Sequence, residues 1–362
     1  VRPSYVLGGR GMAIVYDDSD LVTYMESATH VTPDRPVYLD AFLEDAIELD
    51  VDALCDTEEC YVGSVLEHIE ECGIHSGDSA CCWPPFSLSE KIVDQIRDIT
   101  KKLALACGIR GLLNIQYAVR DEHVFVIELN PRASRTVPFS SKATGVSLAK
   151  YASRIMAGEK ISELRNEGLL PDENRTVDYY AVKEAVMPWS RFPGADSILG
   201  PEMKSTGEVM GIARTFPAAY AKTREAVENK LPEQGSVFIS VCDRDKRAIA
   251  PVAMALENLG YGIYTTGGTA KTLRAAGIDC ATVNRISDGH PNVVDLMRDK
   301  TVSFIINTPH GHEAHSDGTK MRAEAVSQGI TCVTAMSAAT ALIQALAAAR
   351  KSEPETFALQ DL

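Results

Sequence analysis

VIELNPRASR, residues 126–135, is the most informative stretch of the sequence. Its first part predicts a strand over residues 124–130, on which Glu128 and Asn130 share one face because strand side chains alternate with a period of two. Two hard oxygen donors side by side suit a Mg²⁺ ion that bridges nucleotide phosphates. Gln116, on the preceding strand of the same predicted hairpin, would add a third oxygen. We therefore expect a metal site made by Gln116, Glu128 and Asn130.

A pair of arginines follows this strand. Pro131 ends the strand, and Arg132 and Arg135 emerge beside the expected metal site. Two fixed guanidinium groups there would stabilise a phosphoryl group that carries charge. The alternative interpretation is a surface strand end with solvated charges. The apolar residues at 125–127 and 129 favour the site over that alternative.

Around this hairpin the first half of the chain predicts an antiparallel α+β arrangement. Strands are expected over residues 37–42, 48–55, 61–69, 111–120, 124–130 and 179–186. In the strand over residues 48–55, apolar residues alternate with acids. Helices are expected over residues 89–107, 148–157 and 218–230, the first one started by a capping box at Ser87 and Glu90. Residues 161–176 look like a polar loop, and we expect the helices on one side of the sheet.

From Ser236 onward strands and helices alternate strictly. Strands are expected over residues 237–242, 262–266, 281–283, 302–307 and 331–334, and helices over 247–259, 270–276, 292–298, 318–327 and 338–350. This alternation predicts an α/β domain with a parallel sheet that is covered by helices on both faces. Ligands of such domains bind at the carboxyl ends of the strands, here residues 266–269 and 307–311. We expect three parts, residues 1–160, 161–235 and 236–362, with the clearest boundary at 231–235.

Two loops in the first half could hold phosphates. Arg2 and Arg10 bracket a Leu-Gly-Gly turn, and glycine lets backbone amides approach a phosphate closely, although a hairpin turn would look the same. Residues 73–79, GIHSGDS, are dense in donors and acceptors, although local side-chain turns explain part of that pattern. The sequence opens on a strand that lacks neighbouring strands, so we expect a fragment or one piece of a split protein.

Composition narrows the class of protein. The 362 residues include 36 Lys and Arg against 50 Asp and Glu, a formal net charge of −14, which argues against nucleic-acid and anionic-membrane partners. Nine cysteines without a CxxC pair favour reduced, buried thiols of a cytoplasmic protein. The uncharged residues 330–349 are rich in Ala, Thr and Ser, which favours a buried strand and a helix over a membrane span.

Together these segments resemble the ATP-grasp enzymes, and within them the large subunit of carbamoyl-phosphate synthase. The resemblance is carried by residues 1–11, 67–79, 111–116, 128–139, 141–145, 200–203 and 207–211, and it extends over nearly the whole chain. It implies the C-terminal part of that subunit: the second ATP-grasp domain, incomplete at its start, followed by a methylglyoxal-synthase-like (MGS-like) allosteric domain. The implied reaction is ATP-dependent phosphorylation of carbamate to carbamoyl phosphate, for arginine and pyrimidine biosynthesis.

The resemblance also implies cofactors, partners and residue roles. ATP would act with Mg²⁺ or Mn²⁺ and K⁺, and the partners would be the glutaminase small subunit and the carboxyphosphate-forming half of the synthase. Nucleotide contacts would come from Arg2, Asp40, Ala41, Leu43, Glu48, Gly73, Ile74, His75, Ser76, Gln116 and Glu128. Gln116, Glu128 and Asn130 would be the metal ligands. Arg132 and Arg135 would act with Arg10, which belongs to a mobile loop over the phosphates.

Regulatory positions follow from the same resemblance. Glu70, Asp78, Glu184 and Thr334 match positions that hold ornithine in ornithine-activated forms, but Cys332 stands where those forms have an aromatic residue. An effector nucleotide, UMP or IMP, would bind Lys246, Thr266, Thr269, Arg285 and Asn307. Thr266 and Thr269 also suit a phosphate nest on their own chemistry, the alternative being a plain strand-to-helix turn. Pro309 replaces a threonine of nucleotide-regulated forms, which leaves the effector open.

Three further interpretations stay open beside the resemblance. The histidines at 310, 312 and 315 could bind a metal, but we expect a loop with solvated imidazoles because no helix or cysteine is predicted to fix them. Asn114 and Cys107 are expected to be packing residues. The alternative function is a non-catalytic regulatory fragment that binds nucleotides or anions and needs a separate chain for activity.

Overall fold

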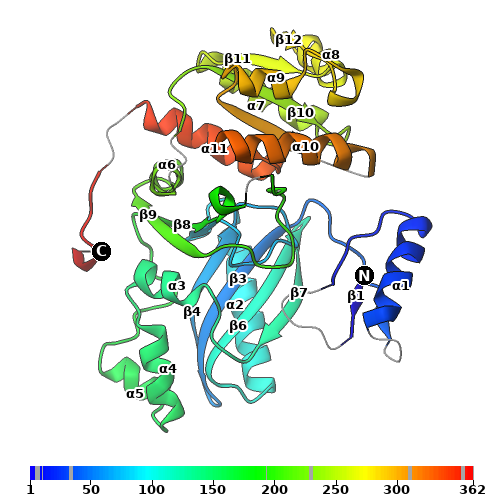
Figure 1. The fold of residues 1–362 in the computed structure, drawn as a ribbon. Coiled ribbons are helices and arrows are strands. Elements are labelled where there is room, and N and C mark those ends of the chain that lie inside the picture. The colour runs from blue at the N-terminus through cyan, green and yellow to red at the C-terminus, as the bar shows by residue number, and fades with distance from the viewer. Residues whose placement is uncertain are drawn as a thin grey trace.

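The computed structural model describes residues 1–4, 9, 11–31, 36–192, 194–227, 231–308, 312–351 and 355–361. Arg10, Pro309 and His310, which the sequence singled out, lie outside these residues. Figure 1 shows two layered bodies. The lower body is an antiparallel sheet with its helices, and the upper body is a parallel sheet with its helices. A helix, α1 (Asp18–Val31), and a two-stranded sheet of β1 (Arg2–Pro3) and β2 (Val37–Tyr38) belong to the N-terminal segment, which lies at the side.

The lower body is built on a seven-stranded sheet in the order β7-β6-β3-β4-β5-β8-β9, with antiparallel pairing throughout. Its strands are β3 (Ile47–Asp56), β4 (Cys60–His68), β5 (Cys81–Trp83), β6 (Arg110–Arg120), β7 (His123–Asn130), β8 (Tyr180–Val186) and β9 (Gly207–Ala213). The two predicted hairpins, β3–β4 and β6–β7, are confirmed.

Helices cover both faces of this sheet, so the expectation of helices on one side is wrong. On one face, Ile96 of α2 (Glu90–Ala106) packs with Val51 and Ile115. On the other face, Leu148 of α4 (Leu148–Met156) packs with Leu54. This second face also carries α3 (Val137–Thr144) and a short helix, α5 (Ile161–Asn166), where the sequence predicted only a polar loop. The inner strand β3 is consequently buried on both sides.

The start of α2 differs from its prediction. Ser89 is the residue that precedes the helix, and it makes no side-chain cap hydrogen bond. The predicted capping box with Ser87 does not form, because the hydroxyl and the backbone amide of Ser87 both donate to the Glu67 carboxylate. The helix ends at Ala106, one residue before Cys107, and Gly108 then adopts a φ of +62°, which a glycine adopts readily.

The upper body confirms the predicted parallel sheet, in the order β12-β11-β10-β13-β14. Its strands are β10 (Ser236–Val241), β11 (Gly262–Thr265), β12 (Ala281–Thr282), β13 (Phe304–Thr308) and β14 (Thr331–Val333). One face is covered by α7 (Lys246–Asn258), α8 (Gly267–Ala275) and α11 (Met336–Ala349), and the other by α9 (Val293–Arg298) and α10 (His312–Gln328). Helix α10 begins at His312, so His312 and His315 belong to a helix and not to the expected loop.

The two bodies meet along α11 and α6 (Phe216–Ala226), which lie side by side in Figure 1. Phe216 and Tyr220 of α6 pack in one core cluster with the alanines at 338, 341 and 345 of α11. Alanine side chains let the two helices approach closely. Among the described residues, no helix is long and apolar enough to cross a membrane.

Candidate active site

Polar side chains gather on one face of the seven-stranded sheet. In the antiparallel register Asp50 lies opposite Gln116, which lies opposite Glu128, while Asp52 lies opposite Asn114, which lies opposite Asn130. Residues directly opposite in an antiparallel pair share a face. The structure therefore brings the three predicted metal ligands together and adds two carboxylates from β3 to the same face.

The end of β7 shows how the expected ligands and arginines are arranged. The Asn130 amide donates to Glu128 Oε1 over 2.7 Å, and Arg132 Nη2 donates to Asn130 Oδ1 over 3.2 Å. Glu128, Arg132 and Arg135 are exposed. The apolar neighbours that favoured a buried setting are exposed too, with fractions of 39% at Phe125, 46% at Val126 and 47% at Ile127. That argument for the site is wrong, whereas the shared face of Glu128 and Asn130 is as predicted.

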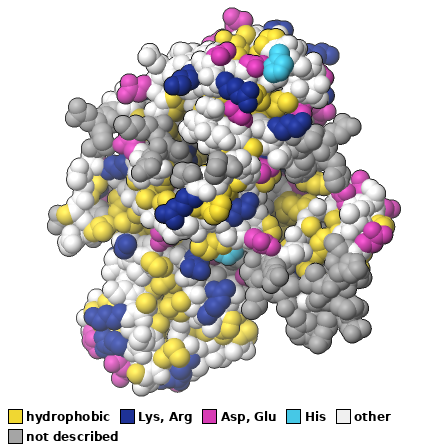
Figure 2. All heavy atoms as spheres, in the orientation of Figure 1, with side chains coloured by type: hydrophobic (Ala, Val, Ile, Leu, Met, Phe, Trp, Pro, Cys, Tyr) yellow, Lys and Arg dark blue, Asp and Glu magenta, His cyan; other side chains and the backbone are white. Residues whose placement is uncertain are grey.

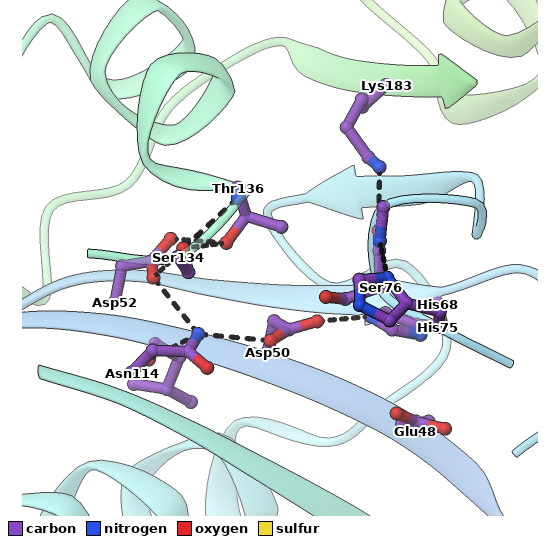
Figure 3. Close-up of polar contacts among 12 residues, drawn as sticks. Glu48, Asp50, Asp52, His68, His75, Ser76, Asn114, Ser134, Thr136 and Lys183 are labelled. Atoms are coloured by element: carbon purple, nitrogen blue, oxygen red, sulfur yellow. Dashed lines mark hydrogen bonds and ion pairs between the residues drawn. The ribbon is translucent and has the colours of Figure 1, made fainter. Parts of the chain in front are cut away.

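The acids of β3, on the same face as the expected ligands, are buried. Asp50 is 0% exposed and lies 2.8 Å from Nε2 of His68, which is likewise buried (Figure 3). Burial alone would raise the pKa of Asp50, but the hydrogen bond and the charge of His68 hold it below its ordinary value. The Asp50 partner in turn raises the pKa of His68 against the effect of burial. Each of the two groups therefore favours the charged form of the other.

Asn114 joins the two carboxylates and is not the packing residue that the sequence suggested. Its amide nitrogen lies 3.0 Å from Asp50 Oδ1 and 3.1 Å from Asp52 Oδ1. The second residue with that expectation, Cys107, is exposed after the end of α2. The sequence signal for the network was present in the alternation of acids along residues 48–52, but such alternation ordinarily marks a strand with one face in solvent.

The loop of residues 73–79 closes over the other end of this face. The Glu48 carboxylate accepts the Gly73 amide over 2.8 Å, and burial raises the pKa of Glu48. His75 Nδ1 accepts the Gly77 amide over 2.9 Å, and burial lowers the pKa of His75. The Ser76 carbonyl accepts the ammonium of Lys183 over 2.9 Å. Lys183 is fully buried, and sequence reasoning missed it.

The remaining expected nucleotide contacts lie along the N-terminal segment and the chain that leads into β3. Arg2 of β1 pairs with Asp40 over 2.9 Å and lies over the ring of Tyr38. Ala41 is exposed, whereas Leu43 and Ile74 are partly buried. A side chain added at Gly73, whose φ is +94°, would lie 3.1 Å from Phe42, so this segment contacts the loop of residues 73–79.

Two of the residues expected to hold ornithine are already bonded to other groups of this chain. Glu184 pairs with Arg224, which sequence reasoning missed, and Asp78 accepts the backbone amides of Lys204 and Ser205 over 2.8 and 2.9 Å. Burial, followed by the charge of Glu184, raises the pKa of Glu70 to about 7. Thr334 and Cys332 are partly buried, the latter in β14.

A second candidate site lies at the carboxyl ends of the parallel strands. Thr266 lies between the end of β11 and the first residue of α8. Its hydroxyl is 3.4 Å from the hydroxyl of Ser240, which belongs to β10. Thr269 is buried, with its hydroxyl 3.5 Å from the Val241 amide. Lys246 pairs with Asp243, and its ammonium would lie 3.4 Å from a side chain added at Gly268.

Two other expected effector residues behave differently from each other. Asn307 is turned inward: its amide donates to the Ser240 carbonyl over 2.9 Å, and its oxygen accepts from Arg322 over 3.3 Å. Arg285 is exposed and lines an open surface pocket with Gly267, Gly268, Arg274 and the chain at 282–284. Figure 2 shows Lys and Arg side chains interspersed with Asp and Glu side chains on the surface of this body.

Comparisons with known proteins match both bodies. A family model described as the carbamoyl-phosphate synthase L chain, ATP binding domain, matches residues 1–164, and a model of the MGS-like domain matches residues 248–334. The biotin carboxylase of Campylobacter jejuni, a solved structure, is 16% identical with a TM-score of 0.48, over 61% of this chain and 55% of that one. A similarity of that size assigns no function.

Curated relatives match along the full chain. The carbamoyl phosphate synthase large chain of Corynebacterium glutamicum is 50% identical and is covered over 34% of its length by the whole of this chain. A protein of Methanocaldococcus jannaschii called the C-terminal section of that large chain is also 50% identical, with 100% of this chain matching 60% of it. The chain thus spans about a third of the complete large chains it matches. It belongs to the carbamoyl-phosphate synthase large-chain family, as a C-terminal part in which an ATP-grasp region is followed by an MGS-like domain.

Proposed function

We propose that this chain transfers a phosphoryl group from ATP to carbamate and so forms carbamoyl phosphate as part of a carbamoyl-phosphate synthase. The observation that supports this most is the shared sheet face of Gln116, Glu128 and Asn130, with the loop of Arg132 and Arg135 directly after it. Such a reaction needs positioned charges and no protein nucleophile. The side chains at this face are of that kind.

The oxygen donors fit a divalent cation. A carboxylate and two side-chain amides on neighbouring strands are hard ligands of the kind that Mg²⁺ takes, and Mn²⁺ accepts the same set. A cation held there would neutralise charge on the nucleotide phosphates. Glu128 would supply the one anionic ligand, with Gln116 and Asn130 as neutral ones.

The protein groups would divide the remaining tasks. Arg132 and Arg135 would stabilise charge on the transferring phosphoryl group, and Glu48 with the loop of residues 73–76 would hold the nucleotide. The buried pair of Asp50 and His68 would offset each other's charge on that face. Arg2 and Asp40 would contact the nucleotide from the N-terminal segment.

The carboxyphosphate-forming half and the glutaminase small subunit are the proposed partners, because the chain matches only part of the complete large chains. The C-terminal body would bind an anionic effector such as UMP or IMP at Lys246, Thr266 and Thr269. Arg285 would add a second cation from the neighbouring pocket. Ornithine control is not part of the proposal, since Arg224 already pairs with Glu184.

The test compares two partial reactions in a synthase reconstituted from this chain, the carboxyphosphate-forming half and the glutaminase subunit. Glu128→Gln should reduce ATP synthesis from ADP and carbamoyl phosphate by about 10²-fold or more. Bicarbonate-dependent ATP hydrolysis should stay within about twofold of the parent enzyme, because the other half would perform it. Glu122→Gln, the same change at the exposed tip of the hairpin, is the control.

Two outcomes would contradict the proposal. Equal loss of both partial reactions in Glu128→Gln would show that this face does not serve carbamate phosphorylation. Absence of ATP synthesis with the parent chain, in an assembly that hydrolyses ATP, would favour the non-catalytic regulatory function.

A further inference from the structure

A buried carboxylate lies directly beneath the loop that carries the two arginines. Asp52, in the middle of β3, is 0% exposed. Its Oδ1 accepts the Ser134 hydroxyl over 2.7 Å, and its Oδ2 accepts the Thr136 hydroxyl over 2.6 Å (Figure 3). Two further donors complete the set, the Asn114 amide at 3.1 Å and the Ser140 hydroxyl at 2.9 Å. All four donors are neutral groups.

Ser134 and Thr136 flank Arg135, and they fix the backbone there as well. The Ser134 oxygen accepts the backbone amides of Thr136 and Val137 over 3.1 and 3.2 Å. The Ser134 and Thr136 hydroxyls also lie 2.7 Å apart, so these two side chains and Asp52 form one hydrogen-bonded cluster beneath the two amides. Asp52 thereby determines the path of the chain on both sides of Arg135.

Most of the residues that bind Asp52 are buried, whereas the two arginines of the loop are exposed. Arg132 and Arg135 are exposed, whereas Thr136 and Ser140 are 0% exposed. Hydrogen bonds that involve a charged partner are about twice as strong as those between neutral groups. Burial raises the pKa of Asp52, and the hydrogen bonds from Thr136 and Ser134 act against that shift. The loop and the carboxylate therefore depend on each other.

We propose that Asp52 is the positioning residue of the arginine loop, residues 131–136, and that its carboxylate holds the backbone so that Arg132 and Arg135 stay at the face of Glu128 and Asn130. The part of this inference that concerns catalysis rests on the proposed function. Its sequence signature is an acid in the middle of a strand together with hydroxyl residues on both sides of the second arginine, more than 80 positions away.

The first experiment measures the loop itself and needs no activity. Asp52→Asn leaves a buried amide among four donors and is prone to misfold, so Thr136→Val is the informative variant, because it removes one donor at nearly constant shape. Trypsin cleavage after Arg132 under native conditions should become about tenfold faster or more, the ratio expected for losing a hydrogen bond to a charged group. Thr136→Ser keeps the hydroxyl and should stay within about twofold of the parent chain.

Thr100→Val is the matched control. Thr100 is also a fully buried threonine, and its hydroxyl contacts the Tyr117 hydroxyl over 2.8 Å in the core between α2 and β6, away from the loop. Its loss should lower the unfolding temperature without exposing Arg132. If Thr100→Val and Thr136→Val speed the cleavage equally, or if neither does, Asp52 has no specific hold on the loop and the proposal is wrong.

The second experiment joins the anchor to catalysis in the reconstituted synthase. Thr136→Val should lower kcat for ATP synthesis from carbamoyl phosphate about tenfold while the KM for ADP changes by less than threefold, and Thr136→Ser should restore kcat. A lower kcat without faster cleavage would overturn the positioning role. Faster cleavage with an unchanged kcat would keep the anchor and overturn the role that the proposed function gives the two arginines.

Discussion

The two sheets of this chain present their polar residues in opposite ways. In the antiparallel sheet, Glu48, Asp50 and Asp52 lie within strand β3 and are buried. In the parallel sheet, Ser240 and Thr266 sit where strands end, at an edge that the helices leave open. A site on a covered face needs a partner for every polar group, whereas a site at strand ends can leave groups for a ligand. Loss of a polar side chain should therefore cost more stability in the first setting.

The largest effect is expected at a residue of the parallel body that is buried, contrary to this contrast. Arg322 of α10 belongs to the parallel body, yet it is fully buried, and its guanidinium binds Asp196 of the other body over 2.5 and 2.8 Å. Arg322→Met should lower the free energy of unfolding by about 3–5 kcal/mol, because it removes the guanidinium that pairs with the partly buried Asp196. Urea unfolding of the full chain measures this loss.

Arg298→Met supplies the control for that experiment. Arg298 pairs with Glu324 over 3.0 Å in the same body, but 60% of its side chain is exposed. Its loss should cost about 0–1 kcal/mol. Similar losses for the two variants would mean that burial does not set the value of charged pairs in this chain.

The second test uses pH and the antiparallel body. Folded Glu70 keeps its proton up to about pH 7, whereas the unfolded group loses it near 4.5. Its contribution to stability is therefore fully present below pH 4.5 and is lost as the pH rises to 7, by about 1–3 kcal/mol. Glu70→Gln should flatten the stability profile over this window. Glu225→Gln, an exposed glutamate beside Arg224, should keep the slope; a slope unchanged in Glu70→Gln would assign it to another group.

The smallest effect is expected at the strand ends of the parallel body. Lys246→Ala should weaken UMP binding about tenfold, measured by calorimetry on the full chain, and the difference should shrink at high salt. Stability should change little, because the Lys246 side chain is 27% exposed and pairs only with the exposed Asp243 in the described part of the chain. Lys271→Ala, an exposed lysine of α8, is the control. Equal affinities for both variants would remove Lys246 from the site.

The parallel body could be predicted closely from sequence because short apolar strands and amphipathic helices alternate there. Its parallel pairing and its helices on both faces follow from that pattern, whereas the order of its strands does not. The largest difference is the start of α10, which lies six residues before the expected Gly318. The family could also be predicted from sequence, because the resemblance rests on motifs that follow one another in order along the chain. The domain boundaries and the roles of the site residues stay predictions.

The network beneath the antiparallel site could not be predicted in the same way. Alternation of acids with apolar residues predicts one face in solvent, but the loop of residues 73–79 and helix α3 cover that face. The partners of Asp52 come from positions 82, 84 and 88 residues later, and Arg322 meets Asp196 across 126 residues. Such pairs depend on tertiary contacts, and local periodicity carries no information about them.

Strand β7 has a further consequence for how this chain behaves in solution. It ends the order of the described seven-stranded sheet, and Phe125, Val126 and Ile127 present apolar side chains along it. A strand at a sheet edge offers backbone donors and acceptors to any other strand, and apolar neighbours strengthen that attraction. Self-association through β7 would grow with protein concentration. The strand that presents Glu128 and Asn130 would therefore also set the tendency of the chain to self-associate. Dilution would reduce self-association and leave the site itself unchanged.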